Sequence, residues 1–401
     1  MALDSITEVT SKSWLTRLID SIKSVALGLL LFLAAFPTLF WNEGCSVRNY
    51  KALKEGATAA VVVDSAAVVP ANEGKLVFTT GRATTTDTLS DPIFNVSTSA
   101  LRLERVVQMY QWTEKSTSEK TKKLGGSEET TSKYTYELAW SAEPKDSSKF
   151  KEPKGHTNPP MAFAPDSWTA NTTLGAFTVP ANLVSSINTS ESLPAPADAV
   201  AKFPADLKAR TTAEAAGTYF VRAADSAGKP EQPALGDLRI SFRRVLPTDV
   251  SVVASQSGPS FAPFATSVSG AYPIYSLKVG RLTKDAMFGQ LQAENTTRTW
   301  IIRGVGFAMM FVGLMLVFQP FVIVADFIPL LGSLLGGGVA IFAFLVAMTC
   351  SLITIAVAWI FYRPLLGIGL FILAVAAIYF LIARARSKAK AKKLAVQPAT
   401  A

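Results

Sequence analysis

The sequence predicts an α+β protein with a four-span α-helical membrane region and a large β-rich extracytoplasmic domain. Three long apolar runs fill residues 300–382, and a fourth fills residues 25–41. The stretch between them, 42–299, is rich in Ser, Thr, Pro, Gly and charge and has no apolar run of span length. Because the hydrocarbon core of a bilayer is about 30 Å thick, runs of roughly 20 apolar residues indicate membrane-spanning helices.

The composition supports a membrane protein. Hydrophobic residues make up 49% of the 401 residues, the mean hydropathy is +0.29, and only 17% are charged, against about 25% in globular domains. The formal charge of +9 is concentrated in a tail without acids, so a membrane surface explains it more simply than a nucleic acid does. The predicted membrane-surface contacts in this tail are Arg384, Arg386, Lys388 and Lys390.

Residues 1–23 are expected to form a cytoplasmic amphipathic helix rather than a cleavable signal peptide, because polar residues continue up to Lys23. Trp14 and the apolar residues that follow it recur at helical spacing, with Lys12 and Arg17 on the other side. This pattern predicts a helix at the membrane surface, with Trp14 in contact with lipid. The alternative is a lead-in helix that packs on protein.

The four spans are predicted at 24–41, 300–325, 339–362 and 364–383. Nineteen uncharged residues lie between Lys23 and Glu43, and 22 lie between Arg303 and Asp326. The 36 uncharged residues between Asp326 and Arg363 are too many for one straight span. Pro329 and the three glycines 336–338 therefore predict an interfacial or re-entrant piece at 326–338.

Positive charge near the span ends predicts the orientation. Lys12, Arg17 and Lys23 at one end, and the basic tail 384–401 at the other, place both termini in the cytoplasm. The domain at 42–299 is then periplasmic or lumenal. Arg303 and Arg363 lie on that far side, against the positive-inside rule.

Alternating apolar and polar residues predict strands in the first part of this domain. The segments are 60–63, 74–81 and 101–112, followed by 134–140 as the hairpin partner of 101–112. The polar connector 115–133 is expected to be an exposed loop.

The second part of the domain repeats this pattern, with strands at 217–222, 237–245, 250–256 and 274–279. The repetition suggests two similar lobes. The best helix candidate between the two parts is 205–216, with Pro204 before it and Gly217 just past its end.

No catalytic, cofactor-binding or metal-binding constellation is found. His156 is the only histidine, and its turn-rich loop shows no nucleophile elbow, which favours a structural role. Cys45 and Cys350 cannot build a disulfide framework. Asp326 lies between apolar segments, where an ionisable group is a functional candidate, but its place near Pro329 favours a helix cap.

Small residues in the spans predict close helix packing, with self-association and packing within the chain left open. The candidates are Gly306, Gly313, Gly332 and Gly336. A channel or transport subunit would need polar groups facing a pore. Its candidates are Gln319, Asp326, Thr349, Ser351 and Thr354.

Several motifs resemble the LUMA (transmembrane protein 43) family across nearly the whole chain. In the first half these are Phe40-Trp-Asn-Glu-Gly44, Asn72-Glu-Gly-Lys-Leu-Val77, Leu89-Ser-Asp-Pro92, Val107-Gln-Met-Tyr-Gln-Trp112 and His156-Thr-Asn-Pro159. In the second half they are Gly236-Asp-Leu-Arg-Ile-Ser-Phe242, Thr299-Trp300, Trp359-Ile-Phe-Tyr-Arg-Pro364 and the basic tail.

The resemblance implies a four-span protein whose large domain faces the endoplasmic reticulum lumen or the space between the nuclear membranes. Eukaryotic members are associated with the inner nuclear membrane, with emerin and lamins, and with self-association through their spans. The alanine-rich composition favours a bacterial member, in which the domain is periplasmic in an inner-membrane protein and emerin and lamins are absent. No catalytic residues carry over from the family.

These observations predict a non-enzymatic membrane scaffold or organiser that self-associates and presents its extracytoplasmic domain to protein or lipid partners. No cofactor is expected. A channel or transport subunit is the alternative, and an enzyme acting at the membrane is a third hypothesis.

Overall fold

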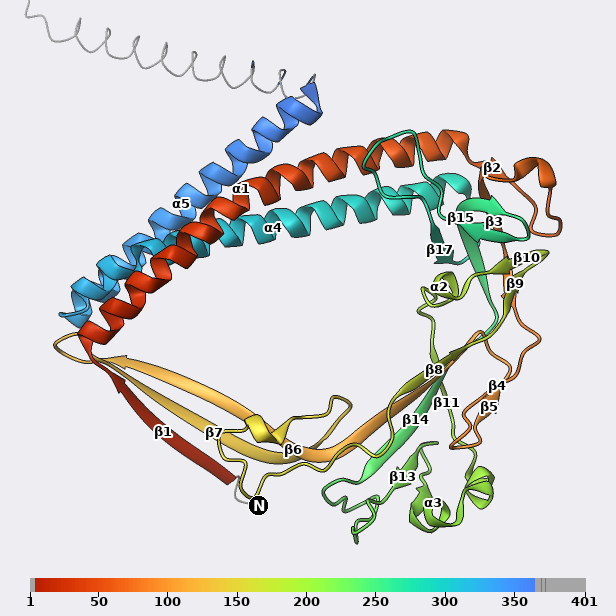
Figure 1. Cartoon of the computed structure of the whole chain (residues 1–401), viewed down its shortest axis with the longest axis horizontal. Helices are drawn as coiled ribbons and strands as arrows, with labels where there is room; N and C mark the ends of the chain where they lie inside the picture. Colours follow the sequence, from red (N-terminus) through yellow and green to blue (C-terminus); the bar gives the residue numbers. More distant parts are fainter. Residues whose placement is uncertain (1–3, 365–368, 370–371, 373–401) are drawn as a thin grey trace, which may run out of the picture. The chain divides into compact units, whose positions relative to one another are not determined.

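The computed structural model describes residues 4–364 together with 369 and 372, and it divides into two compact units (Figure 1). The β-rich unit comprises residues up to 12, 52–123 and 127–292. The helical unit comprises 13–51, 124–126 and the residues from 293 onward. The predicted fourth span, 364–383, and the basic tail, with Arg384, Arg386, Lys388 and Lys390, lie outside the described residues, apart from 364, 369 and 372.

The first sheet of the β-rich unit has eight strands in the order β1-β7-β6-β14-β13-β12, with β8 paired to β6 and β11 paired to β14. All these pairs are antiparallel. The strands are β1 (Asp4–Lys12), β6 (Arg102–Lys122), β7 (Glu128–Ser141), β8 (Asp166–Thr169), β11 (Glu191–Leu193), β12 (Thr211–Ala213), β13 (Tyr219–Val221) and β14 (Leu238–Val245).

The second sheet has seven strands in the order β10-β9-β3-β15-β16, with β17 on β15 and a parallel β2 on β3. Its strands are β2 (Val61–Val62), β3 (Leu76–Thr84), β9 (Thr172–Leu174), β10 (Phe177–Val179), β15 (Thr248–Ser257), β16 (Ser260–Ala262) and β17 (Ser276–Val279). The remaining short elements are β4 (Leu89–Ser90), β5 (Ser97–Thr98), α2 (Ala181–Val184), α3 (Ala205–Arg210) and the 3₁₀ turns Pro70–Asn72, Ser147–Lys149 and Ala197–Lys202.

The predicted strand pattern is confirmed at its centre. Side chains along the first half of β6 alternate between buried and half-buried, because one face of the strand packs on a core that includes Leu103, Val107 and Met109. The second sheet has its own core, built around Leu174, Phe177 and Val252. The two large sheets of the β-rich unit therefore pack on different apolar clusters, and β4 and β5 form a small third sheet.

The β6–β7 hairpin is longer than the sequence predicted. The polar connector 115–133 was expected to be a loop, but the register pairs Lys115 with Thr135 and continues to Lys122 opposite Glu128. A ribbon without a buried face shows no apolar alternation, so the sequence pattern could not reveal it. Cross-strand ion pairs, such as Lys120 with Glu128, replace a core there.

The N-terminal segment differs most from its prediction. Residues 4–12 form a strand, not the start of an amphipathic helix, and all nine residues pair with β7. The Lys151 ammonium donates to Glu8 at 2.8 Å, a contact that raises the pKa of Lys151 above its usual value. The predicted helix is therefore wrong for residues 4–12, whereas the predicted cytoplasmic placement of 1–23 stays a prediction.

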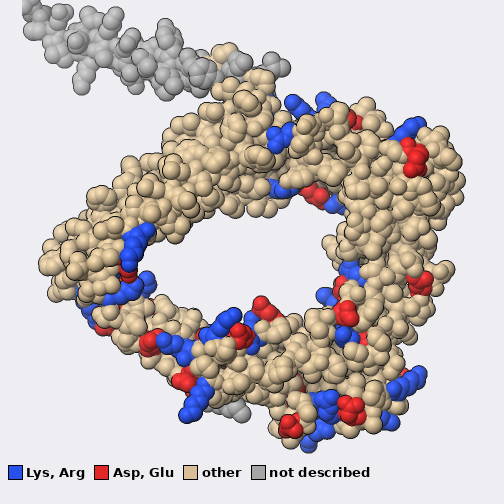
Figure 2. Space-filling model, in the orientation of Figure 1, with Lys and Arg blue, Asp and Glu red and all other residues tan. Residues whose placement is uncertain are grey.

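The helical unit contains most of three long helices that lie side by side in Figure 1. They are α1 (Trp14–Ala59), α4 (Lys284–Ala325) and α5 (Pro329–Tyr362). Each is long and apolar enough to cross a membrane. Their middles present an uncharged surface in Figure 2, with large apolar side chains such as Leu30, Leu33 and Ile341 more than 60% exposed.

The helix boundaries differ from the predicted span boundaries. Residues 42–59 and 284–299, expected in the far-side domain, continue α1 and α4 as helix. The segment 326–338 was expected to break at its three glycines, but α5 begins at Pro329 and runs through them. Pro at the first helical position suits a helix start, because its missing N–H has no helical acceptor there.

Candidate functional site: a polar clamp at one end of the apolar helices

Three motifs that are far apart in the sequence meet in the helical unit. Phe40-Trp-Asn-Glu-Gly44 lies on α1, Thr299-Trp300 on α4, and Trp359-Ile-Phe-Tyr362 at the end of α5. We call their polar contact the Glu43 clamp, formed by Asn42, Glu43, Thr299, Arg303 and Trp359.

Glu43 is the centre of the clamp and is 2% exposed. Its carboxylate accepts two hydrogen bonds from the Arg303 guanidinium, at 2.7 and 2.8 Å, and one from the Trp359 indole N–H at 2.8 Å. A bidentate arginine and an indole together satisfy the carboxylate without water. One side chain of α1 is thereby bonded to both α4 and α5.

The clamp gives a partner to Arg303, which the predicted orientation places against the positive-inside rule. Arg303 is neutralised by Glu43, and its guanidinium also lies 4.6 Å from the centre of the Trp300 ring. Next to it, the Asn42 side chain donates to the Thr299 carbonyl at 3.2 Å. A Cβ on Gly44 would lie 2.6 Å from the Tyr362 ring, so only glycine permits this approach of α1 to α5.

A second buried ion pair lies at the other end of the apolar stretch. Arg17 on α1 and Asp326, in the turn after α4, are 8% and 1% exposed and pair at 2.6 Å. Arg17 also donates to the carbonyl of Gly126, and the Gly125 N–H donates to the Phe327 carbonyl at 3.1 Å. The loop 124–126 is therefore part of this ion-pair site.

Asp326 was considered either as a helix cap or as part of an ion pathway, and it is the partner of Arg17. Trp14, predicted to contact the membrane surface, donates its indole N–H to the Ile323 carbonyl at 2.8 Å. Its ring also packs against Phe327. Contact of Trp14 with lipid stays a prediction.

The glycines proposed for self-association are mostly used within the chain. A Cβ on Gly306 would lie 2.4 Å from Leu39, and one on Gly313 would lie 2.7 Å from the Gly28 carbonyl. Gly332 lies directly against Asp326, whereas Gly336 has only an ordinary contact with Val322. Packing within the chain, the alternative considered above, accounts for three of the four, and a role in self-association stays a prediction.

The polar residues considered for a pore are bonded locally. The Thr349 and Thr354 hydroxyls donate to carbonyls one turn earlier in α5, and Ser351 donates to the Met310 sulfur. The Gln319 side chain accepts from Ser24. These contacts give no support to a channel.

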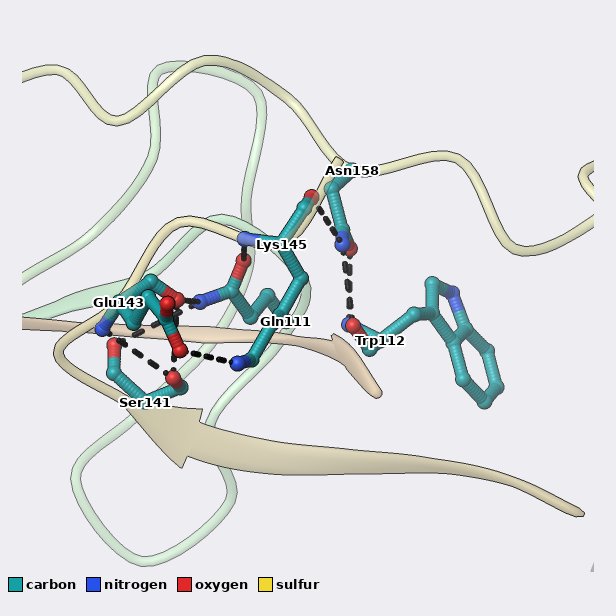
Figure 3. A network of polar contacts seen from close by, with 6 residues as sticks. All are labelled: Gln111, Trp112, Ser141, Glu143, Lys145 and Asn158. Carbon is teal, nitrogen blue, oxygen red and sulfur yellow. Dashed lines mark hydrogen bonds and ion pairs between the residues drawn. The ribbon is translucent and has the colours of Figure 1, made fainter. Parts of the chain in front are cut away.

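In the β-rich unit, motif residues hold loops in place (Figure 3). The fully buried Gln111 donates to the Glu143 carbonyl at 2.9 Å and accepts from the Lys145 N–H at 3.0 Å. Asn158 bonds both the N–H and the carbonyl of Trp112, at 2.7 and 3.0 Å. Asn158 thus continues the hydrogen bonding of β6 beyond Met109, where the pairing with β14 ends, while β7 stays paired with Trp112 on the other edge.

Two buried aspartates have the same structural role. Asp91 accepts from the N–H groups of Ile93 and Phe94 and pairs with Arg105 at 2.6 Å. Asp237 accepts from the N–H groups of Ala223 and Ala234, at 3.0 and 2.7 Å. Carboxylates that accept several N–H bonds are typical fixed points for loops.

His156 is a packed histidine. Its ring is stacked on Tyr136 at 4.0 Å, and it bonds the Glu152 carbonyl and Asp4 of β1. Burial and the neighbouring Glu114 raise the pKa of Tyr136 to about 12. The contacts of His156 join β1, β7 and the loop that contains Glu152.

Apolar helices bound together by buried ion pairs, with a β-rich unit, define an integral membrane protein. The family model for transmembrane protein 43 matches residues 109–364, more than half of the chain. This chain therefore belongs to the transmembrane protein 43 family.

The similarity extends along nearly the full length of animal relatives. Mouse transmembrane protein 43 is 32% identical over 406 residues, covering 97% of this chain and 96% of the mouse protein. The human protein is 32% identical over 394 residues, covering 94% and 93%. A fruit-fly homologue is 28% identical over 357 residues, covering 85% and 89%. No solved structure matches.

Sequence reasoning had not identified the clamp or the Arg17–Asp326 pair as sites. In the sequence, Glu43 was part of a motif at the end of an apolar run, and Arg303 was a run end that went against the positive-inside rule. A usable signal was present, since Glu43, Arg303 and Asp326 each stand at the end of an apolar run. Charges at the membrane edge tend to find partners of opposite sign.

Proposed function

We propose that this chain is a non-enzymatic membrane scaffold that self-associates and presents its β-rich unit to protein or lipid partners. The observation that carries the proposal is that ionisable groups of the helical unit form ion pairs with each other. Glu43 pairs with Arg303, and Arg17 pairs with Asp326. Such charges stabilise a helical framework.

The outer surface of the helices supports the second part of the proposal. A Cβ on Gly337 or Gly338 would meet no atom within 4 Å, and the neighbouring Leu334 is 74% exposed. Small residues on a lipid-facing helix permit close approach of another helix. A second copy of α5 is the partner that this surface suits.

Crosslinking of the full chain in membranes tests self-association. We expect multimers for the wild type and fewer for Gly337→Ile, because the added side chain would hold the helices apart. Gly313→Ile is the matched control, since Gly313 contacts Gly28 and Phe32 within the chain. It should lower the thermal stability of each copy. A wild type that is strictly monomeric in membranes would refute self-association.

The membrane that holds this protein, and the protein partners available to it, depend on whether the organism is a eukaryote or a bacterium. In a eukaryotic cell the proposal includes the endoplasmic reticulum or inner nuclear membrane and partners of the emerin or lamin type. In a bacterium it includes the inner membrane without those partners. The relatives compared above are animal proteins and carry the name of a membrane protein, not of an enzyme.

A further inference from the structure

His156 has a hydrogen-bond acceptor in front of each ring nitrogen. Nδ1 lies 2.9 Å from the Glu152 carbonyl oxygen, and Nε2 lies 3.1 Å from a carboxylate oxygen of Asp4. A carbonyl oxygen can only accept, so Nδ1 must carry a proton in this contact. An ionised carboxylate also only accepts, so Nε2 can bond Asp4 only when it carries a second proton. The two contacts together therefore select the imidazolium form of His156.

A neutral His156 would lose one of these contacts. With its single proton on Nδ1, the ring would turn the lone pair of Nε2 toward the Asp4 carboxylate, and two acceptors repel each other. Asp4 is 63% exposed, so water stabilises its charge and the carboxylate does not supply the missing proton. Histidine gains or loses its proton between about pH 5 and 8. The contact with Asp4 should therefore form at the acidic end of this range and weaken at the alkaline end.

The groups packed around His156 favour a positive charge on its ring. The ring is buried, stacked on Tyr136 at 4.0 Å and edge-on to Trp112 at 4.7 Å. Tyr136, whose pKa is raised to about 12, stays neutral there, and the face of an aromatic ring attracts a cation. The other ionisable groups on the surrounding elements are Asp4 and Glu8 of β1, Glu114 of β6, and Lys151, Glu152 and Lys154 of the loop that follows β7. Four of these six groups are acids, so the balance favours the imidazolium.

The contact with His156 matters for β1 because this strand has no core packing. None of its nine side chains is buried. Its backbone pairs with β7, and two ion pairs join its side chains to the loop that follows β7. These are Asp4 with His156 and Glu8 with Lys151. Loss of the first pair should loosen the start of the strand.

We propose that the contact of the His156 ring with Asp4 is a proton-controlled latch for β1. When the ring is protonated, the latch holds the start of the strand against the sheet. When the ring is neutral, the contact is lost and the first residues of β1 separate from β7 more often. The proposal depends neither on self-association nor on the side of a membrane at which the β-rich unit lies.

Hydrogen exchange of the full chain in detergent tests the latch. Exchange of peptides from residues 4–12 is measured at about pH 5.5 and about pH 7.5, where histidine is mostly charged and mostly neutral. The rates are corrected for the intrinsic effect of pH on exchange. The wild type should be protected about two- to fivefold more at the lower pH, the effect of one partly exposed ion pair. Equal protection at the two pH values would overturn the proposal.

Three variants show whether this pair causes the difference. Asp4→Asn and His156→Gln should each remove the pH difference, and a difference that persists in Asp4→Asn would overturn the latch. Because Asp4 is largely exposed, Asp4→Asn should fold even if His156→Gln does not. Lys151→Gln is the matched control, since it removes the ion pair to Glu8. Neither of those groups titrates in this range, so β1 should loosen at both pH values and the pH difference should remain.

The single histidine of the chain allows a direct measurement. In protein with isotope-labelled histidine, the ring signals in NMR spectra report how many protons the ring carries. The pH at which half of the rings are protonated should be lower in Asp4→Asn than in the wild type, because the carboxylate stabilises the imidazolium. The same midpoint in both proteins would show that Asp4 does not act on the ring and would overturn the latch.

Discussion

The two units satisfy their buried charges in different ways. In the β-rich unit, Asp237 accepts hydrogen bonds from backbone N–H groups of neighbouring loops, and Asp91 combines two such bonds with an ion pair to Arg105. In the helical unit, Glu43 is bonded by the side chains of Arg303 and Trp359. The backbone N–H groups of a helix interior are already used in the helix, so a buried charge there needs side chains from other helices.

This difference determines what each charge does. A carboxylate that accepts backbone N–H groups fixes the path of one loop. A carboxylate bonded by side chains of α4 and α5 fixes how three helices pack. Removing a charge should therefore have a global effect in the helical unit and a local effect in the β-rich unit.

The largest effect is expected for Glu43→Ala. It leaves the Arg303 guanidinium, which is 15% exposed, without its carboxylate and the Trp359 N–H without its acceptor. Loss of one partner of a buried pair costs about 3–5 kcal/mol, so the thermal midpoint in detergent should fall strongly. Glu43→Leu/Arg303→Leu removes both charges and should recover most of the stability. A loss below about 1 kcal/mol for Glu43→Ala, the value typical of an exposed pair, would contradict a buried clamp.

A smaller and local effect is expected for Asp237→Ala. Two loop N–H groups would lose their acceptor, at about 2–4 kcal/mol in total. Hydrogen exchange followed by mass spectrometry should show faster exchange at 222–236, with little change in α1, α4 or α5. Asp166→Ala is the control, since Asp166 is 53% exposed and should change stability by about 0.5 kcal/mol or less. Equal acceleration in the helices would remove the distinction between the units.

The smallest effect on stability is expected for a disulfide that tests where β1 lies. Val9 and Thr131 are register partners, at a Cα separation of about 4.5–5.5 Å that suits a disulfide. In a chain without Cys45 and Cys350, Val9→Cys/Thr131→Cys should oxidise readily in membranes. Val9→Cys/Thr117→Cys should not, because Thr117 on β6 is separated from β1 by β7.

This experiment also decides the topology. Residues 12 and 52 belong to the same unit, so an α1 that crosses the bilayer and a β1 that pairs with β7 exclude each other. An impermeant maleimide should label Val9→Cys and Thr117→Cys from the same face of sealed vesicles. Labelling from opposite faces would show that β1 leaves the sheet when the chain is in a membrane.

The sequence by itself determined the apolar helices and the central strands. Uninterrupted apolar runs and the alternation along 101–112 show directly which side chains leave water. Both patterns arise because transfer of apolar side chains out of water is the main force that stabilises these elements. The predictions failed for segments whose structure does not depend on the burial of apolar side chains. The outer half of the β6–β7 hairpin and β1 bury no face in a core, and their pairing depends on hydrogen bonds and ion pairs to distant partners.

Only the tertiary structure decided which charges meet. Glu43 and Arg303 are 260 residues apart, and Arg17 and Asp326 are 309 apart. No local pattern encodes such a partner, because the choice depends on how whole helices pack. The structure likewise assigned Gly306 and Gly313 to contacts within the chain. The sequence could show only that small residues were there.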